Sequence, residues 1–260
     1  MLAGELYRHR ALVLVLARRD LVARYRGTAL GFAWTLAHPL LYLGVYSVVF
    51  GRIARLGGDG YPAFLFVGLL PWTWFSSSLL VASTSILADG PLVKRAAFPP
   101  SVPPLVVACA SLANFLLALP VLGVVLALWG VRPGVPWLAL PLVVGLQFVL
   151  SLGLGTAAAA LTVRFRDVGQ LLQGLVPLAF LATPIAYPAS LLEERLPALG
   201  RAAVLGNPLA LLASSYQAVL HDGRWPDPLH LLVLAAWCAL AWLAGDRVLA
   251  RLRDRIPEEL

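Results

Sequence analysis

Long apolar runs without a charged residue alternate along this chain with short segments that carry most of the charges. A helix needs about 20 apolar residues to cross the roughly 30 Å hydrocarbon core of a membrane. None of the runs alternates apolar and polar residues as the strands of a membrane barrel do. The pattern therefore predicts an all-α integral membrane protein with six transmembrane helices. The predicted spans are residues 29–50, 63–88, 102–129, 135–163, 168–187 and 229–249.

The composition points to the same fold class. Hydrophobic residues make up 60% of the 260 residues, charged residues make up 13%, and the mean hydropathy is +0.83. Soluble domains hold about 25% charged residues. The net charge of +7 does not indicate nucleic-acid binding, because the basic residues are spread over several membrane-flanking segments and no soluble domain presents them.

Basic residues are more frequent in the segments on one side of the predicted membrane than in the segments on the other side. Lys and Arg near span ends are retained on the cytoplasmic side. Fourteen of the 20 lie before the first span, between the second and third, between the fourth and fifth, and at the end of the sixth or after it, and the other connections hold six. The distribution predicts a multi-pass protein of the cytoplasmic (inner) membrane with both termini in the cytoplasm.

The first 28 residues are basic and contain one short apolar run, ALVLVLA. No small-residue cleavage site follows this run, so it is not a signal peptide. On a helix, four arginines would gather on one face with three apolar residues roughly opposite; they are Arg8, Arg18, Arg19 and Arg26, and Leu2, Leu6 and Val13. We predict an amphipathic interface helix, with its apolar side in the lipid and its arginines on phosphates. A disordered basic flank is the alternative.

The middle of each predicted span lacks Asp, Glu, Lys and Arg. Ion-coupled transporters and many intramembrane enzymes place ionisable groups at that depth, and hydrolysis or group transfer needs a nucleophile with a base or a pair of carboxylates. Catalysis inside the membrane is therefore not expected. The polar residues there are Asn114, Gln147, Gln170 and Gln173, which either hydrogen-bond between helices or touch a polar solute in a pore.

We expect neither a metal site nor an ATP site in this chain. Cys109 and Cys238 both lie in predicted spans, and no His or Cys pair has the spacing of metal ligands. Lys94 is the one lysine, and no G-x-x-x-x-G-K-[ST] segment surrounds it. If transport is driven by ATP, another subunit must bind the nucleotide.

Five segments carry a family resemblance, and they occur in the family's order. They are RRDLVARYRGTALGFAW leading into the first span, GPLVKRAAFPPSVPPL after the second, LTVRFRDVGQLLQ after the fourth, TPIAYP at the end of the fifth, and NPLALLASSYQAVL before the sixth. Together they resemble the ABC-2 type permeases that export polysaccharides, over nearly the whole chain. The resemblance implies a homodimeric channel that moves a lipid-linked polysaccharide outward. It also implies two copies of a separate nucleotide-binding subunit, which would hold ATP and Mg²⁺.

The same resemblance divides the chain into an interface helix (1–28), a six-span transmembrane domain (29–250) and a cytoplasmic tail (251–260). It implies that two basic segments form the cytoplasmic interface, which includes contact with membrane lipids. Their residues are Arg18, Arg19, Arg24, Tyr25 and Arg26 before the first span, and Arg164, Arg166 and Asp167 after the fourth. We expect the second group to act as an orienting anchor rather than as a direct contact with the ATPase.

The connection between the second and third spans has signals for a short, stiff helix. Asp89-Gly90-Pro91 is a helix-start signal and Pro99-Pro100 ends a helix. The resemblance implies that this rod docks on the nucleotide-binding subunit and couples it to the membrane part; a plain connection is the alternative. The residues assigned to coupling are Pro91, Leu92, Val93, Lys94, Arg95 and Phe98.

The segment before the last span is interrupted by prolines. Pro184 and Pro188 break the end of the fifth span, and residues 189–228 hold four more prolines around apolar pieces too short to cross. We expect broken, re-entrant helices on the outer side, which membranes tolerate where protein or water covers the backbone. Pro71 is expected to kink the second span.

Aromatic residues in the first, second and fifth predicted spans suggest how a sugar polymer would be guided. The flat C–H faces of sugar rings stack on Trp and Tyr, and a moving polymer requires many weak contacts. The candidates for the channel lining are Tyr42, Tyr46, Trp72, Trp74 and Tyr187. Packing, or a place in the aromatic belt of the membrane interface, is the alternative for each.

Other functions remain open from the sequence alone. The runner-up within transport is an ABC-2 exporter of a drug or a lipid. Outside transport, a membrane scaffold or a glycan-modifying membrane enzyme is the alternative, and only an enzyme would turn over without any ATPase.

Overall fold

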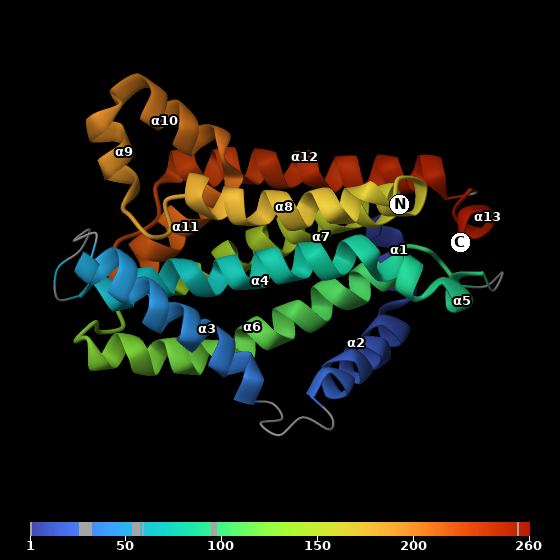
Figure 1. Cartoon of the computed structure of the whole chain (residues 1–260), viewed down its shortest axis with the longest axis horizontal. Coiled ribbons are helices and arrows are strands. Elements are labelled where there is room, and N and C mark those ends of the chain that lie inside the picture. Colours follow the sequence, from blue (N-terminus) through green and yellow to red (C-terminus); the bar gives the residue numbers. More distant parts are fainter. Residues whose placement is uncertain (1, 26–32, 54–57, 59, 95–97, 254) are drawn as a thin grey trace.

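The computed structural model describes residues 2–25, 33–53, 58, 60–94, 98–253 and 255–260, which form helices and their connections and no strand. Figure 1 shows an elongated bundle with both termini at one end. The α-helices are α1 (Leu2–Arg8), α2 (Arg10–Tyr25), α3 (Trp34–Tyr46), α4 (Tyr61–Ala88), α5 (Gly90–Val93), α6 (Val102–Leu128), α7 (Leu140–Arg164), α8 (Asp167–Ala182), α9 (Ala189–Arg195), α10 (Pro197–Gly206), α11 (Pro208–Tyr216), α12 (Pro228–Leu252) and α13 (Ile256–Glu259). Three shorter helical pieces are η2 (Ser47–Ile53), η3 (Val135–Ala139) and η4 (Gln217–His221).

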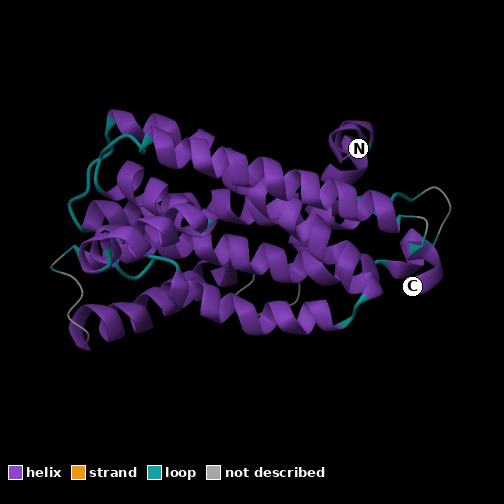
Figure 2. Ribbon diagram, turned by 90° about the horizontal axis from the view of Figure 1, so that it is seen from above, coloured by secondary structure: helices purple, strands orange, loops and turns teal. Residues whose placement is uncertain are grey.

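Four helices are long and apolar enough to cross a membrane. They are α4, α6, α12 and the continuous piece Val135–Arg164, which joins η3 to α7. They run lengthwise through the bundle (Figures 1 and 2). They confirm helices over four of the predicted spans, the second, third, fourth and sixth.

The first and fifth predicted spans are shorter helices. The apolar helix in the first span covers Pro39–Gly51, and residues 29–32 of that span lie outside the described residues. α8 has 16 residues and ends at Ala182, so the predicted end of the fifth span at Tyr187 is wrong. Thr183 is extended (ψ 134°), as expected for a residue that precedes a proline. The count of six spans stays a prediction.

The segment before α12 is broken at one end of the bundle. α9 and α10 project beyond the other helices at the end opposite the termini (Figure 1). Leu199–Gly206 and Pro208–His221 meet at 90°, the geometry of a broken span or a re-entrant loop. Asn207 stabilises the bend because its side chain accepts a hydrogen bond from Leu209 N at 3.0 Å.

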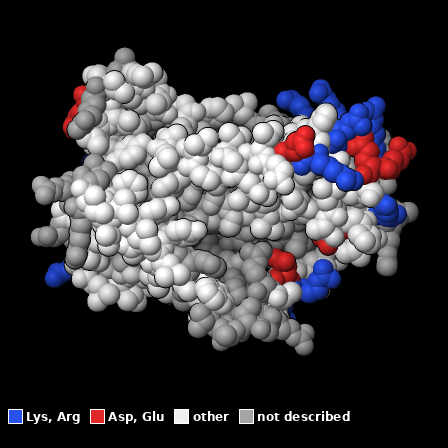
Figure 3. All heavy atoms as spheres, viewed as in Figure 1, with Lys and Arg blue, Asp and Glu red and all other residues white. Residues whose placement is uncertain are grey.

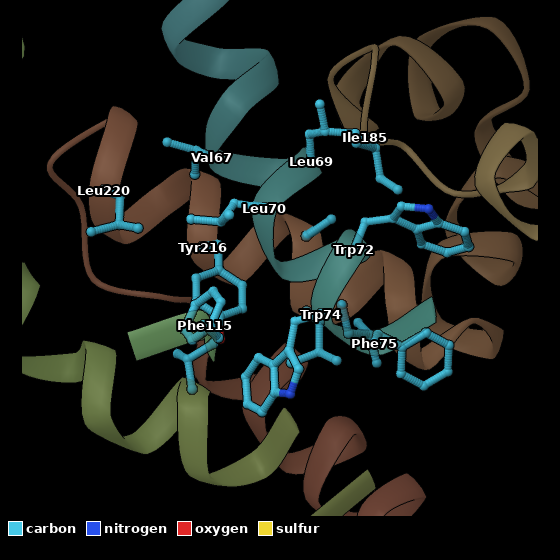
Figure 4. Packing of buried hydrophobic residues seen from close by; sticks show 14 of the residues in the cluster. Val67, Leu69, Leu70, Trp72, Trp74, Phe75, Phe115, Ile185, Tyr216 and Leu220 are labelled. Carbon is cyan, nitrogen blue, oxygen red and sulfur yellow. The ribbon is translucent and has the colours of Figure 1, made fainter. Parts of the chain in front are cut away.

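α4 is the central helix of the fold. It packs against α6, α7, α8 and α11, and its residues contribute most of the core seen in Figure 4. Pro71 lies inside this helix. The Gln147 side chain on α7 donates from Nε2 to the Pro71 carbonyl oxygen at 2.8 Å, so Gln147 makes the interhelical hydrogen bond that was one of its two predicted roles.

α7 and α12 approach each other more closely than side chains permit. A Cβ atom on Gly153 would lie 2.5 Å from the carbonyl carbon of Ala241, and a Cβ atom on Gly245 would lie 2.5 Å from the Gly153 oxygen. Small residues permit such close backbone contact between membrane helices. These two glycines therefore fix α12 against α7.

Candidate functional site

Charged side chains gather at the end of the bundle where both termini lie. Figure 3 shows Lys, Arg, Asp and Glu concentrated there, next to a long surface that carries few charges. This end is built from α1, α2, α5, the α7–α8 turn and α13 (Figure 1). We call it the charged end. Segments that the sequence analysis assigned to the cytoplasmic side therefore lie together in space.

The predicted coupling rod is helical over a shorter stretch than expected. α5 is a single turn, Gly90–Val93, with Pro91 near its start. Lys94 forms a turn and Phe98 lies in a bend, while Arg95 is outside the described residues. The predicted rod over 91–98 is therefore too long. Phe98 precedes Pro99, and a residue before a proline avoids the helical region.

α5 is continuous in hydrogen bonding with the end of α4. The Asp89 amide donates to the Ser85 oxygen at 3.0 Å, and the amides of Leu92 and Val93 donate to the Asp89 oxygen at 2.9 and 3.0 Å. Asp89 is therefore shared by both helices. A displacement of α5 must move the last turn of α4 with it.

One side of α5 is buried and the other is exposed. Val93 is 3% exposed and packs in a cluster with Ile86 on α4 and Ile256 on α13. Pro91 and Lys94 are exposed, and Leu92 is half-buried. This turn is therefore held from inside by apolar contacts and leaves a proline and a cation exposed on its outer side.

The C-terminal residues fold back onto α5 and the α7–α8 turn. Leu260 Cδ2 lies 3.6 Å from the position that a Cβ atom on Gly90 would take. Glu259 pairs with Arg164 at 2.7 Å between Oε1 and Nη1. Sequence reasoning missed this contact and treated 251–260 only as a tail. The available signal was the i, i+4 pair Ile256 and Leu260 in a charged segment, which is typical of a helical face that packs.

The N-terminal helices are also tied to this end. Glu5 accepts a hydrogen bond from Ser101 Oγ and forms an ion pair with Arg253, with 3.0 Å between Oε1 and Nη1. Burial raises the pKa of Asp89, and Arg19 opposes this shift. α2 therefore comes close to the α4–α5 junction.

α2 uses part of its apolar surface for protein contact rather than for lipid. Val13, predicted on the lipid side, is buried together with Ala17 against Leu105 of α6. The positions four residues apart form one narrow face, and the small Ala17 lets the helices approach. Leu14 and Val15 remain exposed. Figure 2 shows the N-terminal helical segment end-on beside the bundle.

The remaining interface residues differ in how they are placed. Arg18 and Arg19 are exposed on α2, and Arg166 and Asp167 are exposed at the α7–α8 turn. Asp167 starts α8, where a carboxylate is favoured by the helix dipole. Arg24 and Tyr25 close α2 with side chains that are not described, and Arg26 lies outside the described residues.

Two predicted lining residues belong to the core. Trp74 is 4% exposed and stacks on Phe115, with ring centroids 4.6 Å apart, and Trp72 packs near Phe180 at 5.5 Å. Figure 4 shows both indoles among side chains of the core. Neighbouring helices cover both rings in this fold, so packing, the alternative given for each, describes how they are placed, and a lining role for them stays a prediction.

The tyrosines are more accessible. Tyr42 is exposed and stacks on Tyr46 at 5.9 Å, and Tyr46 in turn stacks on Phe180 at 5.2 Å. Tyr187 is half-buried, and its hydroxyl donates to the Leu181 oxygen at 3.2 Å. Tyr42 is therefore the most exposed of these three tyrosines.

Within the part of the chain that the structure describes, no group of three or more His, Cys, Asp or Glu residues could hold a metal ion. Cys109 and Cys238 are free thiols.

Comparison with known proteins shows which family the chain resembles. Residues 11–220 match the family model described as ABC-2 type transporter. The chain is 36% identical over all 260 residues to an O-antigen export system permease protein RfbA of Myxococcus xanthus, covering 99% of that protein. Two proteins of the same name from Klebsiella pneumoniae are 31% and 30% identical over 213 residues, 82% of this chain and 81% of theirs. The chain therefore belongs to the ABC-2 type transporter family and is a multi-pass membrane protein.

Proposed function

We propose that this chain is the transmembrane permease subunit of an ATP-driven exporter that carries a lipid-linked polysaccharide of the O-antigen class outward across the cytoplasmic membrane. The observation that carries this proposal is the end-to-end identity of 36% with an O-antigen export permease. A match over both whole chains favours this substrate class over the drugs and lipids that other exporters of the family carry.

The charged end is the docking face for the nucleotide-binding subunit in this proposal. Pro91 and Lys94 are exposed on α5, and Val93 anchors the turn from inside. ATP and Mg²⁺ bind in the partner subunit. Its closure around ATP would push α5, and the backbone bonds through Asp89 would pass the displacement to α4. Because α4 packs against α3, α6, α7, α8 and α11, one push would change the whole bundle.

The flanking residues of this face have supporting roles. Arg164, held by Glu259, would orient the α7–α8 turn, and Arg166 and Asp167 extend that surface. Arg18 and Arg19 on α2 would contact lipid phosphates. Two copies of this chain would form the channel between them, with both termini in the cytoplasm and Tyr42 as the accessible aromatic contact for sugar rings.

Complementation tests this function. In cells that synthesise O-antigen and keep its ATPase but lack their own permease, this chain should restore glycan at the cell surface. An ATPase variant that binds but does not hydrolyse ATP is the control, and it should leave the glycan on its lipid carrier inside. Surface glycan that stays absent at normal permease abundance, together with increased efflux of a drug or a lipid, would instead support the other branch of the family.

A further inference from the structure

A large cavity lies at the end of the bundle opposite the charged end. Its volume is about 920 Å³, within the roughly 300–1,000 Å³ of ligand sites in proteins. It is lined by the start of α4, the loop before α9, the end of η4 and the start of α12. The polar and aromatic side chains that line it include His221, Asp222, Arg224, Trp225 and Asp227.

The cavity wall combines one open aromatic ring with polar groups that hold each other in place. Trp225 is 59% exposed. Asp222 contacts His221 Nδ1 at 2.9 Å and Arg224 Nη2 at 2.5 Å. The hydrogen bond from His221 and the nearby Arg224 lower the pKa of Asp222. The wall therefore offers a fixed carboxylate acceptor and a guanidinium donor beside a flat apolar face.

The balance of charge argues against an anionic ligand. Arg224 faces Asp222, and a second carboxylate, Asp227, also lines the cavity. Asp227 is already used to cap α12, since its side chain accepts from Leu229 N at 2.8 Å. Because the two carboxylates outnumber the one guanidinium among the described lining residues, a phosphate or carboxylate would gain little from them. A neutral polyol with many hydroxyls fits better.

We propose that this cavity is a binding site for a short neutral segment of the exported glycan, with a sugar ring stacked on Trp225 and its hydroxyls bonded to Asp222 and Arg224. This rests on the proposed function, which puts the cavity on the outer side of the membrane where the polymer emerges. Weak binding at this site would hold the emerging glycan and reduce its return into the channel.

The test is binding of delipidated O-polysaccharide from the host cell to the permease–ATPase complex in nanodiscs, measured by calorimetry. Trp225→Ala should weaken binding about tenfold, Asp222→Asn should also weaken it, and Trp225→Phe should keep most of the affinity. Trp129→Ala is the matched control, because Trp129 is an exposed tryptophan at the C-terminus of α6 and does not line the cavity. It should bind as the unmodified complex does.

The outcomes separate this proposal from the function itself. If the unmodified complex exports no glycan in cells, the proposed function fails. If it exports and binds glycan while Trp225→Ala and Asp222→Asn bind equally tightly, the function stands and the cavity assignment is wrong. Displacement of the glycan by inorganic phosphate would also overturn the neutral-glycan assignment. If Trp225→Ala does not accumulate, the comparison of Asp222→Asn with Trp129→Ala decides.

Discussion

Gly153 and Gly245 show at the scale of single residues how this bundle is held without charged groups. Each faces backbone atoms of the other helix, where an added Cβ would lie 2.5 Å from its neighbour. Side chains in a membrane gain little from leaving the lipid, so helix association depends on close packing. The two helices can therefore touch here only because neither position carries a Cβ atom.

The first prediction follows from this contact. Gly153→Ala should force α7 and α12 apart and destabilise the folded chain by about 1–3 kcal/mol, the usual cost of overpacking. Gly145→Ala, in the same helix, is the control because nothing lies within 4 Å of its Cβ position. Thermal unfolding in detergent checks both variants. Equal midpoints for the two would contradict the close contact.

Residues also show why the sites were harder to predict than the fold. The apolar runs require helices, and Thr183-Pro184 signals where α8 ends. α4, however, has no distinct polar face, since its Ser and Thr residues are spread around the helix, so its sequence does not distinguish the face toward Phe115 from a face toward lipid or a pore. That is why Trp72 and Trp74 were assigned to the lining although the fold buries them.

At the scale of elements, α5 and α13 form one unit. Val93 of α5 and Ile256 of α13 share an apolar cluster, and Glu259 reaches Arg164 on the neighbouring turn. An exposed ion pair of this kind contributes about 0–1 kcal/mol, so the apolar contacts hold the unit together and the ion pair sets its orientation. Spacing in the sequence predicted a helix start at Pro91, but nothing local to 91–98 indicates a partner about 160 residues later.

The second prediction concerns this unit. Removing residues 256–260 should leave α5 attached to α4 but unsupported from inside, so ATP hydrolysis in the assembled complex should continue while glycan export falls. Glu258→Ala is the control, because Glu258 is exposed on α13 and makes no ion pair among the described contacts. Export per assembled complex is the measurement. Full export by the truncated chain would show that α13 does not position α5.

The whole molecule is polarised along its long axis. One end carries both termini and most of the visible charges (Figure 3), and the other carries the bent helices and the large cavity. Periodicity and charge counting anticipated this polarity because both depend only on which segments flank the apolar runs. The contacts between those segments depend on the three-dimensional path and were not anticipated.

The last prediction tests which end faces the cytoplasm. In a chain whose Cys109 and Cys238 are replaced by serine, single cysteines introduced at Gly58 and Arg224 should react with a membrane-impermeant maleimide in intact cells. Cysteines at Lys94 and Arg253 should react only after the membrane is opened. All four positions are at least partly exposed in the fold, so a difference in labelling reports the membrane and not burial. The physical reason is the retention of Lys and Arg on the cytoplasmic side, where fourteen of the 20 lie in this topology. Labelling of Lys94→Cys from outside, with export intact, would reverse the assigned orientation. It would place α5 on the outer side, where no ATP-binding subunit can reach it.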